Sequence, residues 1–163
     1  MNTDIIQFGA KGDGKTLNTL AFQRAVEACA ASGGGMVEVP PGRFVTGTIA
    51  LKSNVYLRLA PGAVILGSED IRDYTGTTRG CAFVRVFVNG EREEKHQPDP
   101  CVALIVADRC ENCGIVGRGI IDGQRNSLLG HTPEKGKPYL VVFSECGHVC
   151  MEGVTLQNPG IYC

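Results

Sequence analysis

Tryptophan is absent from the sequence, and all aromatic residues together make up only 6% of its 163 positions. Glycine, in contrast, occurs 22 times. Packing of aromatic side chains therefore cannot dominate the core. The glycines supply the backbone angles that tight corners need. This composition favours one domain with many corners around a core of small aliphatic side chains.

Long apolar runs and an excess of charge of either sign are also lacking. The longest apolar run, Val102 to Ala107, is far shorter than the ~20 residues of a membrane-spanning helix, so no membrane span is expected. With 16 basic and 17 acidic residues the net charge is -1, and no basic stripe emerges, so nucleic acid is not an expected partner.

The N-terminus, M-N-T-D-I-I-Q-F, has neither a basic leader nor a long apolar region. It does not look like a secretory signal. As written, the chain is expected in the cytoplasm, or outside it, secreted or periplasmic, if the N-terminus has been processed.

A unit that occurs more than once organises the chain. Residues 110–123 read C-E-N-C-G-I-V-G-R-G-I-I-D-G, residues 146–158 read C-G-H-V-C-M-E-G-V-T-L-Q-N, and a fainter copy at 53–59 reads S-N-V-Y-L-R-L. One frame matches Cys110 with Cys146, Cys113 with Val149 and Val55, Ile115 with Met151 and Leu57, Gly117 with Gly153, Ile120 with Leu156, and His148 with Asn54 and Asn112.

Each copy alternates apolar and free positions, which is the period of a half-buried strand. One such strand is too short to bury its own face, so the copies must stack on one another. Their uneven spacing requires coils of roughly 20–30 residues with insertions looped out between strands. The sequence therefore predicts a parallel β-helix of about five coils.

One helix is expected, over about residues 19–31. Asn18 or Thr19 can cap it, and Gly33-Gly34-Gly35 ends it. Its apolar face consists of Phe22, Ala25, Val26 and Cys29. Short strands are expected at 5–8, 36–39, 43–46, 48–51, 55–59, 64–66, 102–106 and 139–143, with a charged exposed insertion at about 70–100 and a second polar loop at 123–137.

Residues 9–16, G-A-K-G-D-G-K-T, match the phosphate-binding pattern G-x-x-x-x-G-K-T, and the apolar run that ends at Asp108 could pass for a magnesium-binding strand. Beyond Met36, however, no ten residues sustain a helical period, whereas a nucleotide-binding sheet needs helices on both faces. Asp13 also places an anion where a phosphate needs donors. A P-loop nucleotide-binding protein stays a distant alternative.

Eight cysteines include two close pairs, Cys110 with Cys113 and Cys146 with Cys150. Four thiolates with such spacings could hold zinc, and a pair could form a disulfide or a redox site. The repeat frame instead places Cys113 at an inward strand position, where a free cysteine behaves as a small hydrophobe. Core packing is the favoured interpretation.

Seven segments, taken in order, carry a resemblance to a known family. They are F-G-A-K-G-D-G-K-T (8–16), A-F-Q-R-A-V-E-A-C (21–29), G-G-G-M-V-E-V-P-P-G-R-F (33–44), G-T-I-A-L-K-S-N-V (47–55), L-A-P-G-A-V-I-L-G-S (59–68), G-R-G-I-I-D-G-Q (117–124) and K-P-Y-L-V-V-F (137–143). Together they resemble glycoside hydrolase family 28, the polygalacturonases of the pectin lyase-like superfamily, over nearly the whole chain except the insertion.

The resemblance implies an all-β, right-handed parallel β-helix, with residues 1–163 as the N-terminal part of one domain. Residues 9–16 would then be a structural turn, and the helix would cap the N-terminal end of the coils. It also implies inverting hydrolysis of α-linked galacturonan, in which one carboxylic acid protonates the leaving oxygen and carboxylates activate a water. No metal and no cofactor are expected.

The catalytic set of the resembled family does not occur in this sequence. That set is an Asn-x-Asp, an Asp-Asp pair, a Gly-His-Gly and an Arg-x-Lys, on coils beyond the segment that residues 153–163 resemble. Here Asn2-Thr3-Asp4 lies at the wrong end, and Gly147-His148 lacks the second glycine. No catalytic residue is assigned, Asp122 and His148 are interpreted as corner residues, and this chain alone is expected to be inactive.

Four cationic side chains are the candidates for substrate binding, because the polar loop that carries them could border a sugar cleft and cations suit uronate carboxylates. They are Arg125, His131, Lys135 and Lys137. A merely solvated loop is the competing interpretation. The expected partner is a pectic poly- or oligosaccharide. A non-catalytic β-helix that binds carbohydrate or joins an assembly is the alternative function. Self-association through the open C-terminal coil is expected of this chain in addition.

Overall fold

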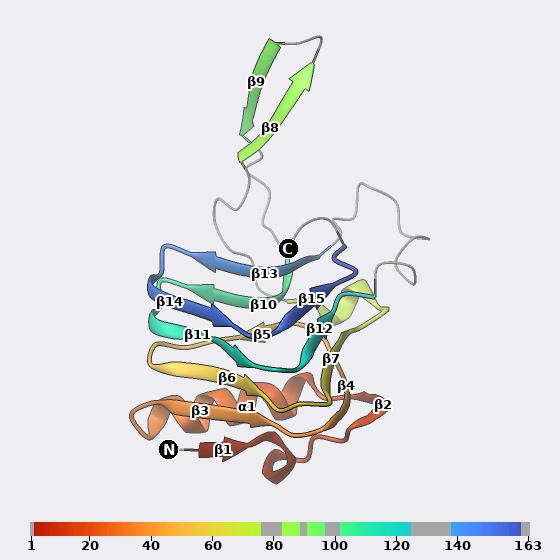
Figure 1. The fold of residues 1–163 in the computed structure, drawn as a ribbon, viewed down its shortest axis with the longest axis vertical. Coiled ribbons are helices and arrows are strands. Elements are labelled where there is room, and N and C mark those ends of the chain that lie inside the picture. Colours follow the sequence, from red (N-terminus) through yellow and green to blue (C-terminus); the bar gives the residue numbers. More distant parts are fainter. Residues whose placement is uncertain (1, 76–82, 89–90, 97–101, 125–137, 161–163) are drawn as a thin grey trace.

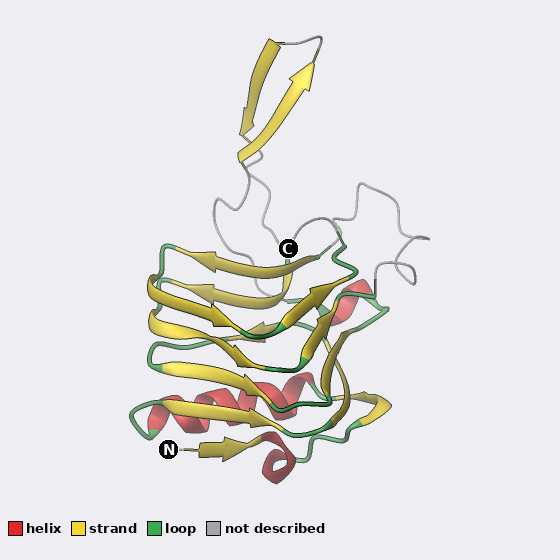
Figure 2. Ribbon diagram, in the orientation of Figure 1, coloured by secondary structure: helices red, strands yellow, loops and turns green. Residues whose placement is uncertain are grey.

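The computed structural model describes residues 2–75, 83–88, 91–96, 102–124 and 138–160, with the backbone alone described for 83–88 and 91–96. In these ranges the chain winds into the expected right-handed parallel β-helix (Figures 1 and 2). No helix within them is both long enough and apolar enough to cross a membrane.

Three parallel sheets form the sides of the coils. The first contains β1 (Asn2–Asp4), β3 (Gly35–Val39), β6 (Val55–Leu59), β11 (Glu111–Gly117) and β14 (Gly147–Glu152). The second contains β2 (Asp13–Leu17), β4 (Gly42–Thr46), β7 (Ala63–Gly67), β12 (Ile120–Asp122) and β15 (Thr155–Gln157). The third contains β5 (Ile49–Ala50), β10 (Ala103–Asp108) and β13 (Tyr139–Ser144).

The repeat frame is the stacking register of the first sheet. Ile115 pairs with Leu57 on one side and with Met151 on the other, and Cys113 pairs with Val149. Leu57 in turn pairs with Val37 of the coil before. The sequence frame therefore predicts which residues lie above one another in this sheet.

The frame is wrong by one residue in the second sheet, where Ile121 and not Ile120 pairs with Leu156. Two residues, Arg118 and Gly119, separate Gly117 from β12, whereas a single residue separates Gly153 from β15. This extra corner residue shifts the register. Asp122 consequently pairs with Gln157 and not, as expected, with Asn158.

The core is the column of inward side chains from successive coils. Val37, Val55, Leu57, Cys113 and Ile115 are completely buried. Val149 and Met151 occupy the same inward register, yet they are 39% and 42% exposed because β14 is the edge strand of its sheet.

Helix α1 (Thr19–Ala31) occupies the segment in which the sequence indicates a helix, and it lies across the N-terminal end of the coils (Figure 1). Phe22 packs edge-on against Phe44, with 6.3 Å between ring centroids and 86° between ring planes. The buried face of the helix consists of Ala21, Phe22, Ala25, Val26 and Cys29.

Asn18 precedes α1, but its side chain makes no capping hydrogen bond, so this part of the sequence interpretation is wrong. The Asn18 side chain is buried, and its hydrogen bonds go to the 9–16 segment and to β4 instead of to the helix. Its Oδ1 accepts from the Lys11 N–H at 2.7 Å, and its Nδ2 donates to the carbonyls of Lys11, Thr16 and Val45. Asn18 therefore ties the 9–16 segment to β4.

Two further segments differ from expectation. Residues Ile5–Phe8, expected as a strand, form the 3-10 helix η1, and the first strand is β1 before it. Inside the expected insertion, β8 (Phe83–Val88) and β9 (Glu91–His96) pair as an antiparallel hairpin. Alternation in these segments is too weak, and charge in β9 too dense, for the sequence to mark them as strands.

We predict that Asn18→Ala lowers the free energy of unfolding by about 2–4 kcal/mol, because buried carbonyls and an N–H lose their partner at once. Urea denaturation measures this. Asn18→Asp should cost at least as much, since it keeps an acceptor for the Lys11 N–H but turns a second oxygen toward the three carbonyls to which Nδ2 donates. Unchanged stability in Asn18→Ala would show that Asn18 does not hold the segment.

Candidate functional site

The candidate binding residues Arg125, His131, Lys135 and Lys137 lie outside the described residues. The residues on either side of this segment are described: Gln124 follows β12, and Pro138 precedes β13. The segment thus leaves and rejoins the coils at the corner between the second and the third sheet, which we call the insertion corner. The longer insertion, between β7 and β10, uses the same corner.

Among the described residues, Asp122 is the carboxylate nearest in sequence to these candidates, and it lies at the insertion corner. Its Oδ1 accepts from the Gln124 N–H at 2.9 Å and from Asn158 Nδ2 at 3.0 Å, and its Oδ2 accepts from Gln157 Nε2 at 2.8 Å. Burial favours the neutral acid, but these three donors together with Arg43 outweigh it and lower the pKa of Asp122. Asp122 is therefore an ionised acceptor that holds two coils together.

Residues 68–75, which we call the strap, pack against the body at the same corner and contain the 3-10 helix η2 (Ile71–Asp73). Ser68 Oγ donates to Asp73, and the Tyr74 hydroxyl donates to the Ser68 carbonyl at 2.9 Å. Burial, followed by the charge of Asp73, raises the pKa of Tyr74. The Tyr74 hydroxyl consequently remains a neutral donor.

The close approach of the strap requires a glycine beneath it. A Cβ on Gly47 would lie 1.9 Å from the Asp73 carbonyl oxygen, which no packing can accommodate. The strap is further tied down by Thr75, whose N–H donates to Thr48 Oγ1 at 3.1 Å. The expected insertion therefore begins with residues that belong to the packed body.

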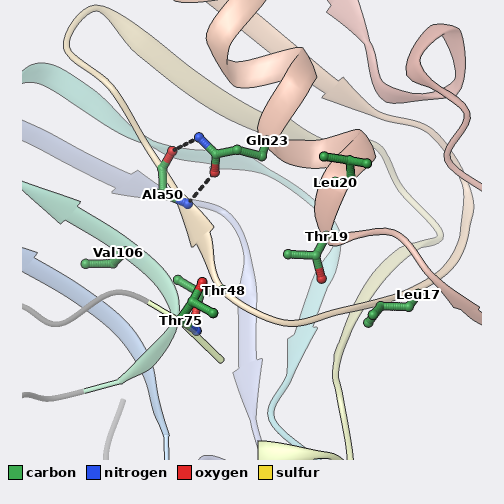
Figure 3. A pocket seen from close by; sticks show the side chains of 8 residues that line it. All are labelled: Leu17, Thr19, Leu20, Gln23, Thr48, Ala50, Thr75 and Val106. Atoms are coloured by element: carbon green, nitrogen blue, oxygen red, sulfur yellow. Dashed lines mark hydrogen bonds between the residues drawn. The ribbon is translucent and has the colours of Figure 1, made fainter. Parts of the chain in front are cut away.

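A groove of about 520 Å³ lies between the strap, the first turns of α1 and the third sheet (Figure 3). Gln23 crosses it toward β5, where its Oε1 accepts from the Ala50 N–H at 3.2 Å and its Nε2 donates to the Ala50 carbonyl at 3.5 Å. The lining residues are Leu17, Thr19, Leu20, Gln23, Thr48, Ala50, Thr75 and Val106.

The chemistry of this groove is apolar and neutral. Leu17 and Leu20, which line it, are 48% and 62% exposed overall. The polar groups of the lining are the threonine hydroxyls and one amide. No carboxylate, histidine or thiol is among the described residues that line it. The groove can contact a ligand, but it offers no general acid or base.

Carboxylates elsewhere in the described ranges are engaged in local contacts. Asp13, Asp70, Asp108, Glu38 and Glu111 accept from neighbouring backbone or side-chain donors. None of these contacts sets an acid and a base face to face across a cavity. The described part of the chain therefore supplies structural carboxylates.

His148 lies at a corner, as its repeat position suggests. Asn54, Asn112 and His148 all adopt left-handed backbone angles, with φ of 63°, 51° and 51°. Asn112 Nδ2 donates to Asn54 Oδ1 at 3.2 Å, and the His148 Nδ1 lies 3.0 Å from Glu111 Oε2. Asparagine tolerates this conformation better than other non-glycine residues, which explains the repeat.

The cysteine pairs do not assemble a metal site. Cys113 points into the core, whereas Cys150, which pairs with Gly114 on β11, belongs to the opposite face of the sheet. Within the described residues no group of three or more potential metal ligands comes together. Burial raises the pKa of the Cys113 thiol to about 12, so it stays protonated and acts as a core side chain.

The 9–16 segment is not a phosphate-binding loop. Lys15 and Thr16 lie in β2, not at the start of a helix. The Asp13 carboxylate already accepts from the N–H groups of Lys15 and Thr16, at 2.9 and 2.8 Å. The backbone donor Thr16 is the main reason that the pKa of Asp13 falls from 3.8 to about 2.

For this reason we predict that Mg-ATP does not raise the thermal midpoint of the protein. Lys15→Ala should also leave the midpoint within the small range typical of surface substitutions, with or without Mg-ATP. Differential scanning fluorimetry measures both. A nucleotide-induced rise that disappears in Lys15→Ala would restore the P-loop interpretation.

We further predict that Asp122→Asn lowers the free energy of unfolding by about 1–2 kcal/mol at neutral pH, because an amide cannot accept from all three donors. Since folding lowers the Asp122 pKa, its contribution is present above the unfolded pKa and is lost as pH falls through the folded pKa. Urea denaturation at neutral and acidic pH measures this.

The matched control is Asp108→Asn, because the Asp108 carboxylate pairs with the neighbouring Arg109 on the surface and should contribute little. Equal losses for the two variants would contradict the structural role of Asp122.

The comparisons with known proteins agree with this fold. The chain is 39% identical over 127 residues to the exo-poly-alpha-D-galacturonosidase of Dickeya chrysanthemi, which covers 74% of this chain and 19% of that protein. It superposes on the exopolygalacturonase of Thermotoga maritima with a TM-score of 0.76 and 26% identity, over 100% of this chain and 43% of the other.

The family 28 exopolygalacturonase of Yersinia enterocolitica superposes with a TM-score of 0.76, at 24% identity, over 98% of this chain and 35% of the other. No family model matches the sequence. The chain spans less than half of the length of each of these three proteins. In sequence and in fold, the chain is polygalacturonase-like and resembles a portion of the enzymes of glycoside hydrolase family 28.

Proposed function

We propose that this chain is the N-terminal part of a polygalacturonase-like glycoside hydrolase that cleaves α-linked galacturonan by inverting hydrolysis. The observation that carries the proposal is the 39% identity over 127 residues with an exo-poly-alpha-D-galacturonosidase. The fold supports the same assignment, because two of its parallel sheets each contain five stacked strands. The substrate class is then a pectic polysaccharide.

The chain alone is proposed to be inactive. Inverting hydrolysis needs a general acid and a base about 6.5–9.5 Å apart, with a water between the base and the sugar. Asp122 instead holds a corner through three donors, and Glu38, Asp70 and Asp108 form ion pairs. Carboxylates on further coils would supply the chemistry, and the present coils would supply the platform on which those coils stack.

Substrate binding is proposed for the cationic loop at the insertion corner. Arg125, His131, Lys135 and Lys137 fall between Gln124 and Pro138, the two residues at which the loop meets the coils. Guanidinium and ammonium groups bind carboxylates with charge-assisted hydrogen bonds, and every galacturonate unit carries one carboxylate. Contacts there would select a uronate polymer over a neutral one.

A second candidate function is a non-catalytic module that binds carbohydrate or joins an assembly. The observation that favours it is the exposure of Val149 and Met151 at core positions of the edge strand β14. An edge strand with exposed apolar side chains can pair along its open side with a strand from a second copy. Self-association through this end of the coils is compatible with both candidates, since the last coil is open in either case.

The two candidates are separated by comparing the purified chain with a longer chain in one assay. For the chain alone we predict no release of reducing sugar from polygalacturonate above a boiled control, because the described residues contain no paired acid and base to supply the general acid–base contribution of ~10²–10⁴-fold. The same assay on a chain extended by the coding sequence that follows should give turnover if the first candidate is right.

Sedimentation velocity, run in parallel, measures association through β14. Val149→Lys with Met151→Lys should shift any dimer to monomer, while Ile6→Lys, at an exposed apolar residue of η1, is the matched control. Turnover by the chain of 163 residues would refute the assignment of Asp108 and Asp122 to structural roles.

A further inference from the structure

Cys110 and Cys146 occupy the same corner of two successive coils. The residues on either side are paired: Asp108 with Ser144, and Glu111 with Gly147. The Gly147 N–H also donates to the Cys110 carbonyl at 3.0 Å. The two cysteines are therefore one inter-strand step apart, about 4.7–4.9 Å, which lies within the Cα separation of about 4.4–6.8 Å that a disulfide spans.

The sulfur of Cys146 already points toward its neighbour. Its Sγ lies 3.4 Å from the Cys110 backbone nitrogen, so the side chain is directed from its own coil to the preceding one. The Cys110 Sγ lies 3.3 Å from the Asp108 carbonyl and 3.6 Å from the Leu51 carbonyl. Rotation of the Cys110 side chain about χ1 is the main adjustment that would bring the two sulfurs together.

Access to the two thiols differs. Cys110 is buried and 6% exposed, whereas Cys146 is only partly buried. Burial, together with the nearby Cys146, raises the pKa of the Cys110 thiol, which therefore stays protonated. A reagent from solution meets Cys146 first, and Cys110 can follow as the resolving thiol.

We propose that Cys110 and Cys146 form a cross-coil disulfide by exchange with a small-molecule disulfide such as oxidised glutathione. The Cys146 sulfur attacks one sulfur of the reagent, the reagent's S–S bond breaks, and one equivalent of small thiol leaves. The Cys110 sulfur then attacks the Cys146 side of the mixed disulfide and releases the second equivalent. The two protein thiols are oxidised, and the reagent takes up their two protons and two electrons.

Cys113 is the competing partner, because its thiol also interacts with the side chain of Cys146. Cys113 is completely buried and lies within β11. Its backbone is paired with Val149, three residues beyond Cys146. Cys150 belongs to the outer face of β14. What distinguishes Cys110 is its register: it occupies the same corner position as Cys146, whereas the backbone of Cys113 is paired with Val149.

The bond would join the two last coils of the described structure covalently. It would close a loop that contains β11, β12 and β13, and such closure stabilises a fold by restricting its unfolded chain. The edge coil, which exposes Val149 and Met151, would gain most from this constraint. The inference is independent of the proposed hydrolase activity.

The test is disulfide mapping on the full chain after incubation with oxidised glutathione and alkylation of the remaining thiols. We expect the loss of two hydrogen atoms in the intact mass, a higher thermal midpoint, and a bond between Cys110 and Cys146. Cys110 and Cys113 share one tryptic peptide, residues 110–118, so fragment ions between them must locate the bond.

Variants make the assignment independent of fragmentation. Cys113→Val, which installs the residue found at the same register in Val55 and Val149, should keep the bond, as should Cys150→Ala. Cys146→Ala should abolish both the bond and the rise in thermal midpoint. A bond to Cys113, or glutathione retained on Cys146 without an intramolecular bond, would overturn the proposal.

Discussion

The structure depends on the parallel hydrogen-bonded register between successive coils. Each coil contributes a strand of only a few residues, which cannot bury its own apolar face. Pairing of Leu57 with Val37 below it and Ile115 above it converts these short strands into one continuous core. Every other feature, from the corner asparagines to the capping helix, either maintains that register or closes its end.

The register is maintained by two sheets and the core between them. The connection between the second and the third sheet can therefore vary in length from coil to coil. Between the second and the third sheet one coil turns with two residues, Gly47 and Thr48, whereas the next two coils insert residues 68–102 and 123–138. Long insertions cost little additional closure entropy. This corner gathers Asp122, the strap and the flanks of the cationic loop, so binding is proposed there and not at the paired strands.

Much of this architecture could be predicted from the sequence, because the inward positions of β6, β11 and β14 repeat as apolar residues and the corner positions as asparagine or histidine. The one-residue shift of register at Arg118 could not be predicted, since the glycines on either side of Arg118 allow either register. The role of Asn18 was missed because a polar residue before a helix normally caps it, whereas here burial beside β4 offers four partners. The candidate cations rest on charge alone, because a loop without periodicity gives no register from which to place them.

The most direct test of this account is a methyl NOE spectrum of the protein with labelled Leu, Val and Ile side chains. The account predicts contacts from Ile115 to Leu57 and from Leu57 to Val37, since each pair lies at the same level in adjacent coils. Contacts from Ile115 to Val55 or Leu59 in their place would mean a two-residue slip of the register. Their absence altogether would contradict the stacked coils on which the fold and the proposed function both rest.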